Sequence, residues 1–217
     1  MNTRIIKISP GIIEIDKIGK IVEVLRRDGV IVYPTETFYG LGANGFSAKA
    51  IREVYRLKKR EALKPLSVVI SDISMLDQVV SEIPPFFRPL ISEFWPGPLT
   101  IILKASPEVP VELQGEGTIG VRLTGHKWVR SLVSQAHFPI TATSANISGD
   151  KEISSPDNVK ELYVGKVDLI VDGGVTPGIV PSTVVDMSGG EPRLVREGGI
   201  SSAQLKKFLP SLSDPPS

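Results

Sequence analysis

The sequence has no cysteine among its 217 residues, which excludes disulfides, thiolate zinc sites and a cysteine nucleophile. It has only two histidines, His126 and His137. Neither has companions at metal-ligand spacing, so a histidine metal site and a Ser-His-Asp triad both lack support. We assign both histidines to surface or packing roles and expect no metal ligands from the protein.

Long apolar runs and a charge excess are also missing. No run approaches the ~20 residues of a membrane-spanning helix, and residues 1–7 do not resemble a signal peptide. Lys and Arg number 25 against 24 Asp and Glu, for a net charge of +1, so nothing attracts nucleic acid or membrane to the whole surface. We expect a cytoplasmic protein without a membrane partner, whose anion sites are local.

The composition that remains is that of a folded globular chain, with 41% hydrophobic and 23% charged residues. A chain of this length buries one substantial core. We therefore predict one domain over residues 1–210, followed by a short frayed tail, 211–217.

Apolar periodicity predicts alternating helices and strands. Helices are expected near 18–28 (closed by Gly29 as the C-cap), 50–58, 86–94, 128–135, 158–163 and 202–209. Strands are expected at 30–33, 66–70, 99–103, 118–123, up to 140–141, 169–171, 183–187 and 193–196, with loops at 34–45 and 143–149. The alternation predicts an α/β fold with a sheet flanked by helices, and the closely spaced late strands predict some antiparallel pairing.

Polar side chains follow several of these strands, where open α/β sheets tend to bind ligands. Thr35, Glu36 and Thr37 come directly after strand 30–33, although simple turn capping would also explain them. The loop 143–149 offers hydroxyls, an amide and a glycine suited to phosphate or ribose. Arg122 and Arg196 each stand at a strand end, and both could face one cleft.

A basic cluster, Lys58, Lys59, Arg60 and Lys64, stands at the end of the helix over 50–58 and in the following turn. Cations at a helix C-terminus complement its dipole, and a solvated face is the plain alternative. If the cluster is functional, Lys58→Ala or Arg60→Ala should reduce turnover by far more than stability, because surface turns tolerate substitution.

Gly40, Gly42 and Gly45 spell G-x-G-x-x-G, the dinucleotide-binding pattern. In such units the glycines turn directly out of the strand, whereas here the polar hexapeptide 34–39 intervenes. Glycines that only permit tight turns are the alternative.

Taken together, ordered motifs across almost the whole chain resemble the YrdC-like family of threonylcarbamoyl-AMP synthases. The motifs are PTETFYGLG at 34–42, KKR at 58–60, KPL at 64–66, FWPGPLT at 94–100, GVR at 120–122, SANISG at 144–149, PSTVVD at 181–186 and REG at 196–198. The chain resembles the short members, because longer ones carry a linker and a C-terminal domain.

The resemblance implies a YrdC-like fold, a twisted sheet around a concave cavity that holds ATP, threonine and bicarbonate, with Mg²⁺ on the triphosphate. The implied reaction forms threonylcarbamoyl-AMP and pyrophosphate. A tRNA threonylcarbamoyl transferase machinery would then use the product for N6-threonylcarbamoyladenosine at tRNA position 37. This makes the implied enzyme a nucleotidyltransferase.

The resemblance also implies roles for residues that match the motifs. The catalytic set is Lys58, Arg60, Ser144 and Asn146. The substrate-binding set is Thr35, Thr37, Arg122 and Ser182, with Arg122 pairing with the carboxylate of the amino acid. The nucleotide-binding set is Arg60, Lys64, Thr118, Ser144, Ser155 and Arg196.

Two positions depart from the family pattern: Val69 replaces a substrate-side histidine of some longer members, and Glu61 replaces a proline. The alternative function is a paralogue of the same fold that binds tRNA or double-stranded RNA, or does other nucleotide chemistry. An RNA-binding protein would be strongly salt-sensitive, whereas a synthase releases pyrophosphate only with threonine and bicarbonate.

Overall fold

A computed structural model gives the fold and describes residues 2–9, 11–61, 65–178 and 180–213. The described strands are β1 (Arg4–Lys7), β2 (Ile31–Tyr33), β3 (Gly40–Gly42), β4 (Ser67–Ile70), β5 (Leu99–Lys104), β6 (Thr118–Leu123), β7 (Ile140–Ser144), β8 (Leu169–Asp172), β9 (Thr183–Asp186) and β10 (Arg193–Arg196). The helices are α1 (Ile15–Arg26), α2 (Ala48–Lys58), η1 (Ile73–Met75), α3 (Leu76–Val79), α4 (Phe87–Phe94), α5 (Lys127–Ala136), α6 (Pro156–Tyr163) and α7 (Ser202–Lys206). Among these helices, none combines the length and the apolar character needed to cross a bilayer.

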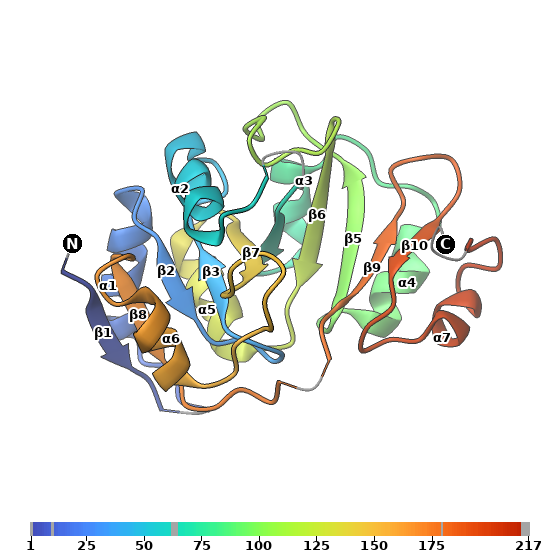
Figure 1. Ribbon diagram of the computed structural model, residues 1–217. Coiled ribbons are helices and arrows are strands. Elements are labelled where there is room, and N and C mark those ends of the chain that lie inside the picture. The colour runs from blue at the N-terminus through green and yellow to red at the C-terminus, as the bar shows by residue number, and fades with distance from the viewer. Residues whose placement is uncertain (1, 10, 62–64, 179, 214–217) are drawn as a thin grey trace.

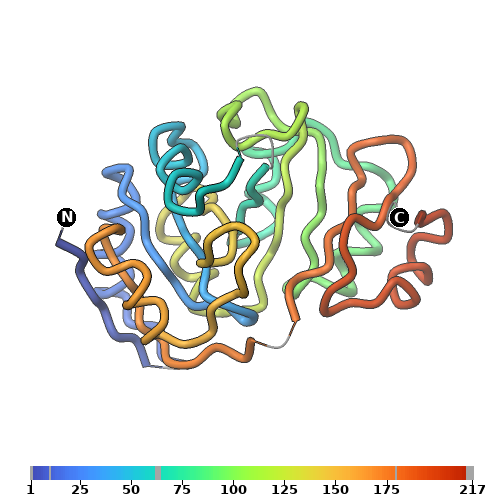
Figure 2. The backbone as a smooth tube through the Cα atoms, viewed as in Figure 1, coloured from blue at the N-terminus to red at the C-terminus, as the bar shows by residue number. Residues whose placement is uncertain are grey.

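All these strands form one twisted sheet in the order β1-β8-β2-β3-β7-β4-β6-β5-β9-β10 (Figure 1). The sheet mixes parallel pairs, such as β4 with β6 and β5 with β9, with antiparallel ones, such as β5 with β6. The two chain ends lie at opposite ends of this sheet (Figure 2). The predicted α/β class with a mixed sheet is confirmed, as is the antiparallel pairing of the late strands β9 and β10.

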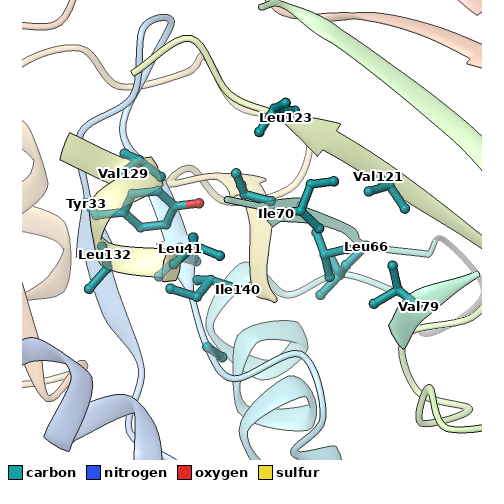
Figure 3. Close-up of a cluster of buried hydrophobic side chains, with 14 of the residues drawn as sticks. Tyr33, Leu41, Leu66, Ile70, Val79, Val121, Leu123, Val129, Leu132 and Ile140 are labelled. Carbon is teal, nitrogen blue, oxygen red and sulfur yellow. The ribbon is translucent and has the colours of Figure 1, made fainter. Parts of the chain in front are cut away.

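The core lies between the sheet and its helices, with α1 packed against α5. Tyr33, Leu41, Leu132 and Ile140 are fully buried there, and their side chains lie together in Figure 3. The Tyr33 hydroxyl stays satisfied because it donates to the Thr141 carbonyl oxygen at 3.0 Å. This packing fixes the middle of the sheet, from which the polar segments extend.

The predicted loop over 34–45 is wrong in its second half, because Gly40–Gly42 is strand β3 between β2 and β7. The glycines are required by packing. A Cβ added to Gly42 would lie 2.8 Å from the Tyr33 ring, and one on Gly40 would lie 3.3 Å from it. Neither glycine has a positive φ, so the dinucleotide pattern is a coincidence of sheet packing.

We expect Gly42→Ala to lower the free energy of unfolding by about 1–3 kcal/mol, because the new methyl group overpacks a buried aromatic ring held in a strand. Denaturant unfolding measures this. Gly190→Ala is the control, since a Cβ there meets nothing within 4 Å. Equal stability of the two variants would contradict the packing role.

Other local predictions also need correction. Gly29 is not the left-handed cap of α1: Asp28 takes that conformation (φ 59), and the Gly29 N–H closes the turn on the Val24 carbonyl oxygen. The predicted loop over 143–149 begins two residues too early, because β7 extends to Ser144. Strand β1 and the helical turns over 73–79 were not predicted.

The predicted fraying from Ser211 is wrong for the first residues of the tail. Leu212 is buried, and the Leu194 N–H donates to the Ser213 carbonyl oxygen at 2.9 Å beside β10. The packed body therefore continues through Ser213.

Candidate functional site

A cavity of about 440 Å³ opens across the middle of the sheet. Its walls come from the segment after β2 and from strands β4, β5, β6, β7, β9 and β10, several of which are distant in sequence. Among the predicted site residues it is lined by Thr35, Thr37, Arg60, Thr118, Arg122, Ser144, Ser182 and Arg196. The fold therefore brings eight of the predicted residues to one cavity.

Thr35 and Thr37 lie in the turn after β2. The Thr35 hydroxyl donates to the Phe38 carbonyl oxygen at 2.6 Å and accepts from the Thr37 N–H at 3.1 Å. The two hydroxyls are 3.1 Å apart. The two threonines therefore both cap the turn and line the cavity, because the hydrogen bonds that close the turn also hold the two hydroxyls at the cavity wall.

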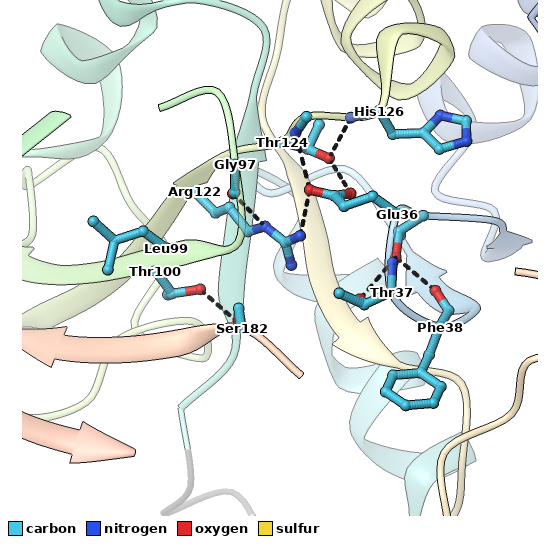
Figure 4. Close-up of polar contacts among 12 residues, drawn as sticks. Glu36, Thr37, Phe38, Gly97, Leu99, Thr100, Arg122, Thr124, His126 and Ser182 are labelled. Carbon is cyan, nitrogen blue, oxygen red and sulfur yellow. Dashed lines mark hydrogen bonds and ion pairs between the residues drawn. The ribbon is translucent and has the colours of Figure 1, made fainter. Parts of the chain in front are cut away.

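Arg122 belongs to β6 and is 8% exposed. Its Nε donates to the Gly97 carbonyl oxygen at 3.2 Å, and its Nη2 pairs with Glu36 Oε1 (Figure 4). Glu36 also accepts from the Thr124 hydroxyl at 2.5 Å and the Gly125 N–H at 2.9 Å. Burial alone would raise the pKa of Glu36, but Arg122 and these donors lower it overall. The Glu36 carboxylate is therefore held in place behind the guanidinium of Arg122, which lines the cavity.

Lys58, at the end of α2, is 2% exposed. Its ammonium donates to the Ser144 carbonyl oxygen and, at 2.8 and 3.1 Å, to the carbonyl and side-chain oxygens of Asn146. The Ser144 hydroxyl donates to the same Asn146 oxygen at 2.5 Å. Lys58 and Asn146 thus meet Ser144 behind the cavity wall and are absent from its described lining.

Burial, with a smaller effect of the Arg60 charge, lowers the pKa of Lys58 to about 8. All three ammonium protons have acceptors, so the geometry suits the charged form. Lys58 is buried rather than placed in a surface turn, so its loss should cost stability as well as turnover.

The remaining cations gather on two walls. Arg60 follows α2, and its Nη2 donates to the Pro65 carbonyl oxygen at 3.0 Å. Arg196 on β10 donates from Nε and Nη2 to the Ser182 carbonyl oxygen at 3.1 and 2.8 Å. Burial lowers the pKa of both guanidinium groups, and the charges of Arg122 and Arg60 reinforce the effect at Arg196. Three arginine side chains that line one cavity favour an anionic ligand.

Smaller polar groups complete the wall. The Thr118 hydroxyl donates to the Gly115 carbonyl oxygen at 2.5 Å, and the Ser182 hydroxyl lies 3.1 Å from that of Thr100. Ser155 is not among the described lining residues; its hydroxyl caps α6 by accepting from the Asp157 N–H. Lys64 lies outside the described residues.

Sequence reasoning left several cavity residues out of the predicted site. These are Thr100, Thr124, Thr143 and Glu152. The sequence places Glu36 after a strand and between two predicted site threonines, and this position is a signal for a site residue. Nothing in the sequence signals Glu152, because the two cations that its charge affects, Lys58 and Arg196, come from other elements. Val69, one of the two departures from the family pattern, forms part of the apolar wall.

Within the described residues no group of three or more His, Cys, Asp or Glu side chains could hold a metal ion. Glu152 is the one acidic side chain among the described residues that line the cavity. Its charge raises the pKa of both Lys58 and Arg196, against the larger effect of burial. If a metal ion enters the cavity together with a ligand, the described lining can therefore supply at most one carboxylate to coordinate it.

A family model named Sua5_yciO_yrdC, described as telomere recombination, matches residues 23–198. The threonylcarbamoyl-AMP synthase of Pyrococcus abyssi is 38% identical over 186 residues, which cover 85% of this chain and 55% of that protein. The crystal structure of P. abyssi Sua5 complexed with L-threonine has a TM-score of 0.93 and 36% identity, covering 99% of this chain and 63% of that one. That of E. coli YciO has a TM-score of 0.86 and 30% identity, covering 95% and 99%.

The chain thus spans about half the length of the curated synthase from P. abyssi, while it corresponds to nearly all of E. coli YciO. The cavity-lining residues lie within the stretch that the family model matches, 23–198. The similarity therefore includes the whole candidate site.

Proposed function

Because this chain belongs to the Sua5/YciO/YrdC family, we propose that it is an L-threonylcarbamoyladenylate synthase. It makes threonylcarbamoyl-AMP and pyrophosphate from threonine, bicarbonate and ATP. The observation that carries the proposal is the convergence of Arg60, Arg122 and Arg196 with the Thr35 and Thr37 hydroxyls on one cavity. Such a site suits an amino-acid carboxylate together with a polyphosphate.

In this proposal Arg122, Thr35, Thr37 and Ser182 bind threonine. Arg60, Arg196, Thr118 and Ser144 bind ATP, and Lys64 and Ser155 are further predicted contacts. Lys58 and Asn146 hold the strand end that carries Ser144. The two substrates then meet between β6 and β7, with amino-acid groups and phosphate groups on adjoining walls.

The reaction joins two anions, so alignment and charge stabilisation provide most of the catalysis. The carboxylate of the N-carboxylated threonine attacks the α-phosphorus, a new P–O bond forms, and the bond to pyrophosphate breaks. Arg60 and Arg196 stabilise the negative charge that develops on the phosphate oxygens. No covalent protein nucleophile is needed.

Mg²⁺ on the triphosphate fits this cavity. Glu152 is the residue that could hold it, and phosphate oxygens and water would supply the other ligands, as is usual for this ion. When bound, Mg²⁺ neutralises phosphate charge. We also propose that the product passes to a tRNA threonylcarbamoyl transferase machinery in the cytoplasm.

The deciding experiment measures pyrophosphate release from ATP with Mg²⁺, threonine and bicarbonate, omitting each in turn. Serine replaces threonine as the comparison amino acid. We expect release only when threonine and bicarbonate are both present. A second candidate function is that of a paralogue that binds RNA or carries out other nucleotide chemistry. We retain it because this chain corresponds to nearly all of E. coli YciO. ATP binding without dependence on the two co-substrates would favour it, and RNA binding would then be tested.

ATP affinity should depend on pH near 8. The pKa of Lys58 is lowered to about 8 by burial, so its positive charge behind the cavity wall is lost as the pH rises from 7 to 9. We expect the dissociation constant for ATP to rise severalfold over this range, measured by calorimetry. Lys58→Arg, which stays charged, should flatten the profile, and an identical profile for this variant would contradict the role of Lys58.

A further inference from the structure

Glu36 connects two parts of the site that are distant in the sheet. It lies in the turn after β2, and its three donors, Arg122, Thr124 and Gly125, lie at the end of β6. Strands β3, β7 and β4 separate β2 from β6 in the sheet order. The carboxylate therefore fixes the turn that carries Thr35 and Thr37 to the strand that carries Arg122 (Figure 4).

The hydrogen bonds of Arg122 determine which of its donors remain for a ligand. A guanidinium has five N–H donors in a rigid fork. The Nε hydrogen goes to Gly97 and one Nη2 hydrogen to Glu36, so the edge formed by Nε and Nη2 is occupied. Within the described part of the chain, Nη1 has no hydrogen-bond partner. The edge formed by Nη1 and Nη2 thus keeps its geometry for a bidentate carboxylate.

The proximity of Glu36 to an anion-binding arginine has a cost, because its negative charge opposes any incoming carboxylate. Two effects with opposite signs therefore compete. By orienting Arg122, Glu36 strengthens substrate binding, and by neutralising Arg122, it weakens binding. Arg122 is a long side chain with many rotamers. Without Glu36, the hydrogen bond to Gly97 is the one that would still hold its guanidinium among the residues that the structure describes.

We propose that Glu36 is a positioning residue for the amino-acid substrate, acting through Arg122 without touching the substrate. The inference rests on the proposed function, in which Arg122 binds the threonine carboxylate. It adds that orientation outweighs charge neutralisation, which makes Glu36 a determinant of amino-acid affinity.

The test is Glu36→Gln, which removes the charge with little change in size. We expect the KM for threonine to rise at least tenfold, while the dissociation constant for ATP stays within twofold. Tighter threonine binding would show that Glu36 acts only by neutralising Arg122, and would overturn the proposal. An unchanged KM in a variant of an otherwise active synthase would overturn it as well, and would leave the proposed function intact.

The matched control is Asp186→Asn. Asp186 also accepts from an arginine, Arg193, and from a backbone N–H and a hydroxyl, both of Ser188. It is not among the described lining residues. Removal of this carboxylate should change the KM for threonine by less than twofold. A tenfold rise in this control too would assign the effect to general destabilisation and would overturn the proposal.

A double-mutant cycle separates positioning from a purely structural role. In an Arg122→Met background, Glu36→Gln should change threonine binding by less than twofold, because no guanidinium remains to be oriented. Additive losses would contradict the proposal. If Glu36→Gln does not fold, Thr124→Val removes one donor to the same carboxylate and should raise the KM for threonine severalfold. Absence of threonine-dependent pyrophosphate release in the wild-type protein would remove the proposed function and this inference together.

Discussion

Lys58→Met is expected to lower the free energy of unfolding by about 3 kcal/mol and pyrophosphate release by more than a hundredfold. Lys58 is 2% exposed, and its ammonium donates three hydrogen bonds to residues 144 and 146. Methionine fills similar volume but leaves these buried oxygens without their charged donor, which costs about 1–3 kcal/mol for each group left unsatisfied. The backbone at Ser144, on the cavity wall, then loses its anchor.

Denaturant unfolding and pyrophosphate release measure the two effects on the same preparation. Lys49→Met is the control, because Lys49 lies on the same helix with its side chain 76% exposed and its Asp28 partner 3.5 Å away. Exposed pairs of this kind contribute about 0–1 kcal/mol. A Lys58→Met protein as stable as the Lys49→Met protein would mean that the three hydrogen bonds contribute little.

Arg60→Ala remains the variant expected to separate turnover from stability. Arg60 follows the helix, lines the cavity and is only partly buried. The sequence placed Lys58 and Arg60 together in one basic cluster, and the structure separates them: one ends α2 inside the protein, and the other extends to the ligand side. Lys58 and Arg60 are two residues apart in sequence, yet at the end of the helix their side chains lie on opposite sides of the cavity wall.

The fold was predictable where one physical signal dominated. Apolar periodicity identified α2, α4, α5 and most of the strands, because each buries one continuous apolar face. Strand β3 was missed because Gly40–Gly42 has the composition of a turn. The close approach of Tyr33 and Ile31 on the neighbouring strand, and of the Thr143 carbonyl oxygen, explains why glycine is needed there. Residues 4–7 were missed because β1 is a short, mostly exposed edge strand, in which only Ile6 packs against the core.

The sequence predicted which residues form the site much better than it predicted how their side chains are arranged in space. Motif order identified Arg122, Ser182 and Arg196, and the sheet brings them to one cavity. The pairing of Glu36 with Arg122 joins residues 86 positions apart. No local pattern encodes such a contact, since it depends on how β2 and β6 are placed within the sheet.

Arg122→Met should raise the KM for threonine about a hundredfold and leave the dissociation constant for ATP within threefold. A bidentate pair between a guanidinium and a carboxylate is among the stronger hydrogen-bonded contacts, and a hundredfold loss corresponds to about 2.7 kcal/mol. The phosphate-side cations Arg60 and Arg196 are untouched by this change.

Arg196→Met is the reciprocal variant, because its guanidinium is fixed on β10 by the Ser182 carbonyl oxygen. It should weaken ATP binding at least tenfold and change the KM for threonine much less. Calorimetry with ATP and steady-state kinetics in threonine separate the two constants. If both variants weakened both substrates equally, the cavity would act as one undivided anion site, and the assignment of separate amino-acid and nucleotide walls would be wrong. If Arg122→Met weakened mainly threonine binding and Arg196→Met mainly ATP binding, a single arginine side chain on each wall would decide which anion binds there.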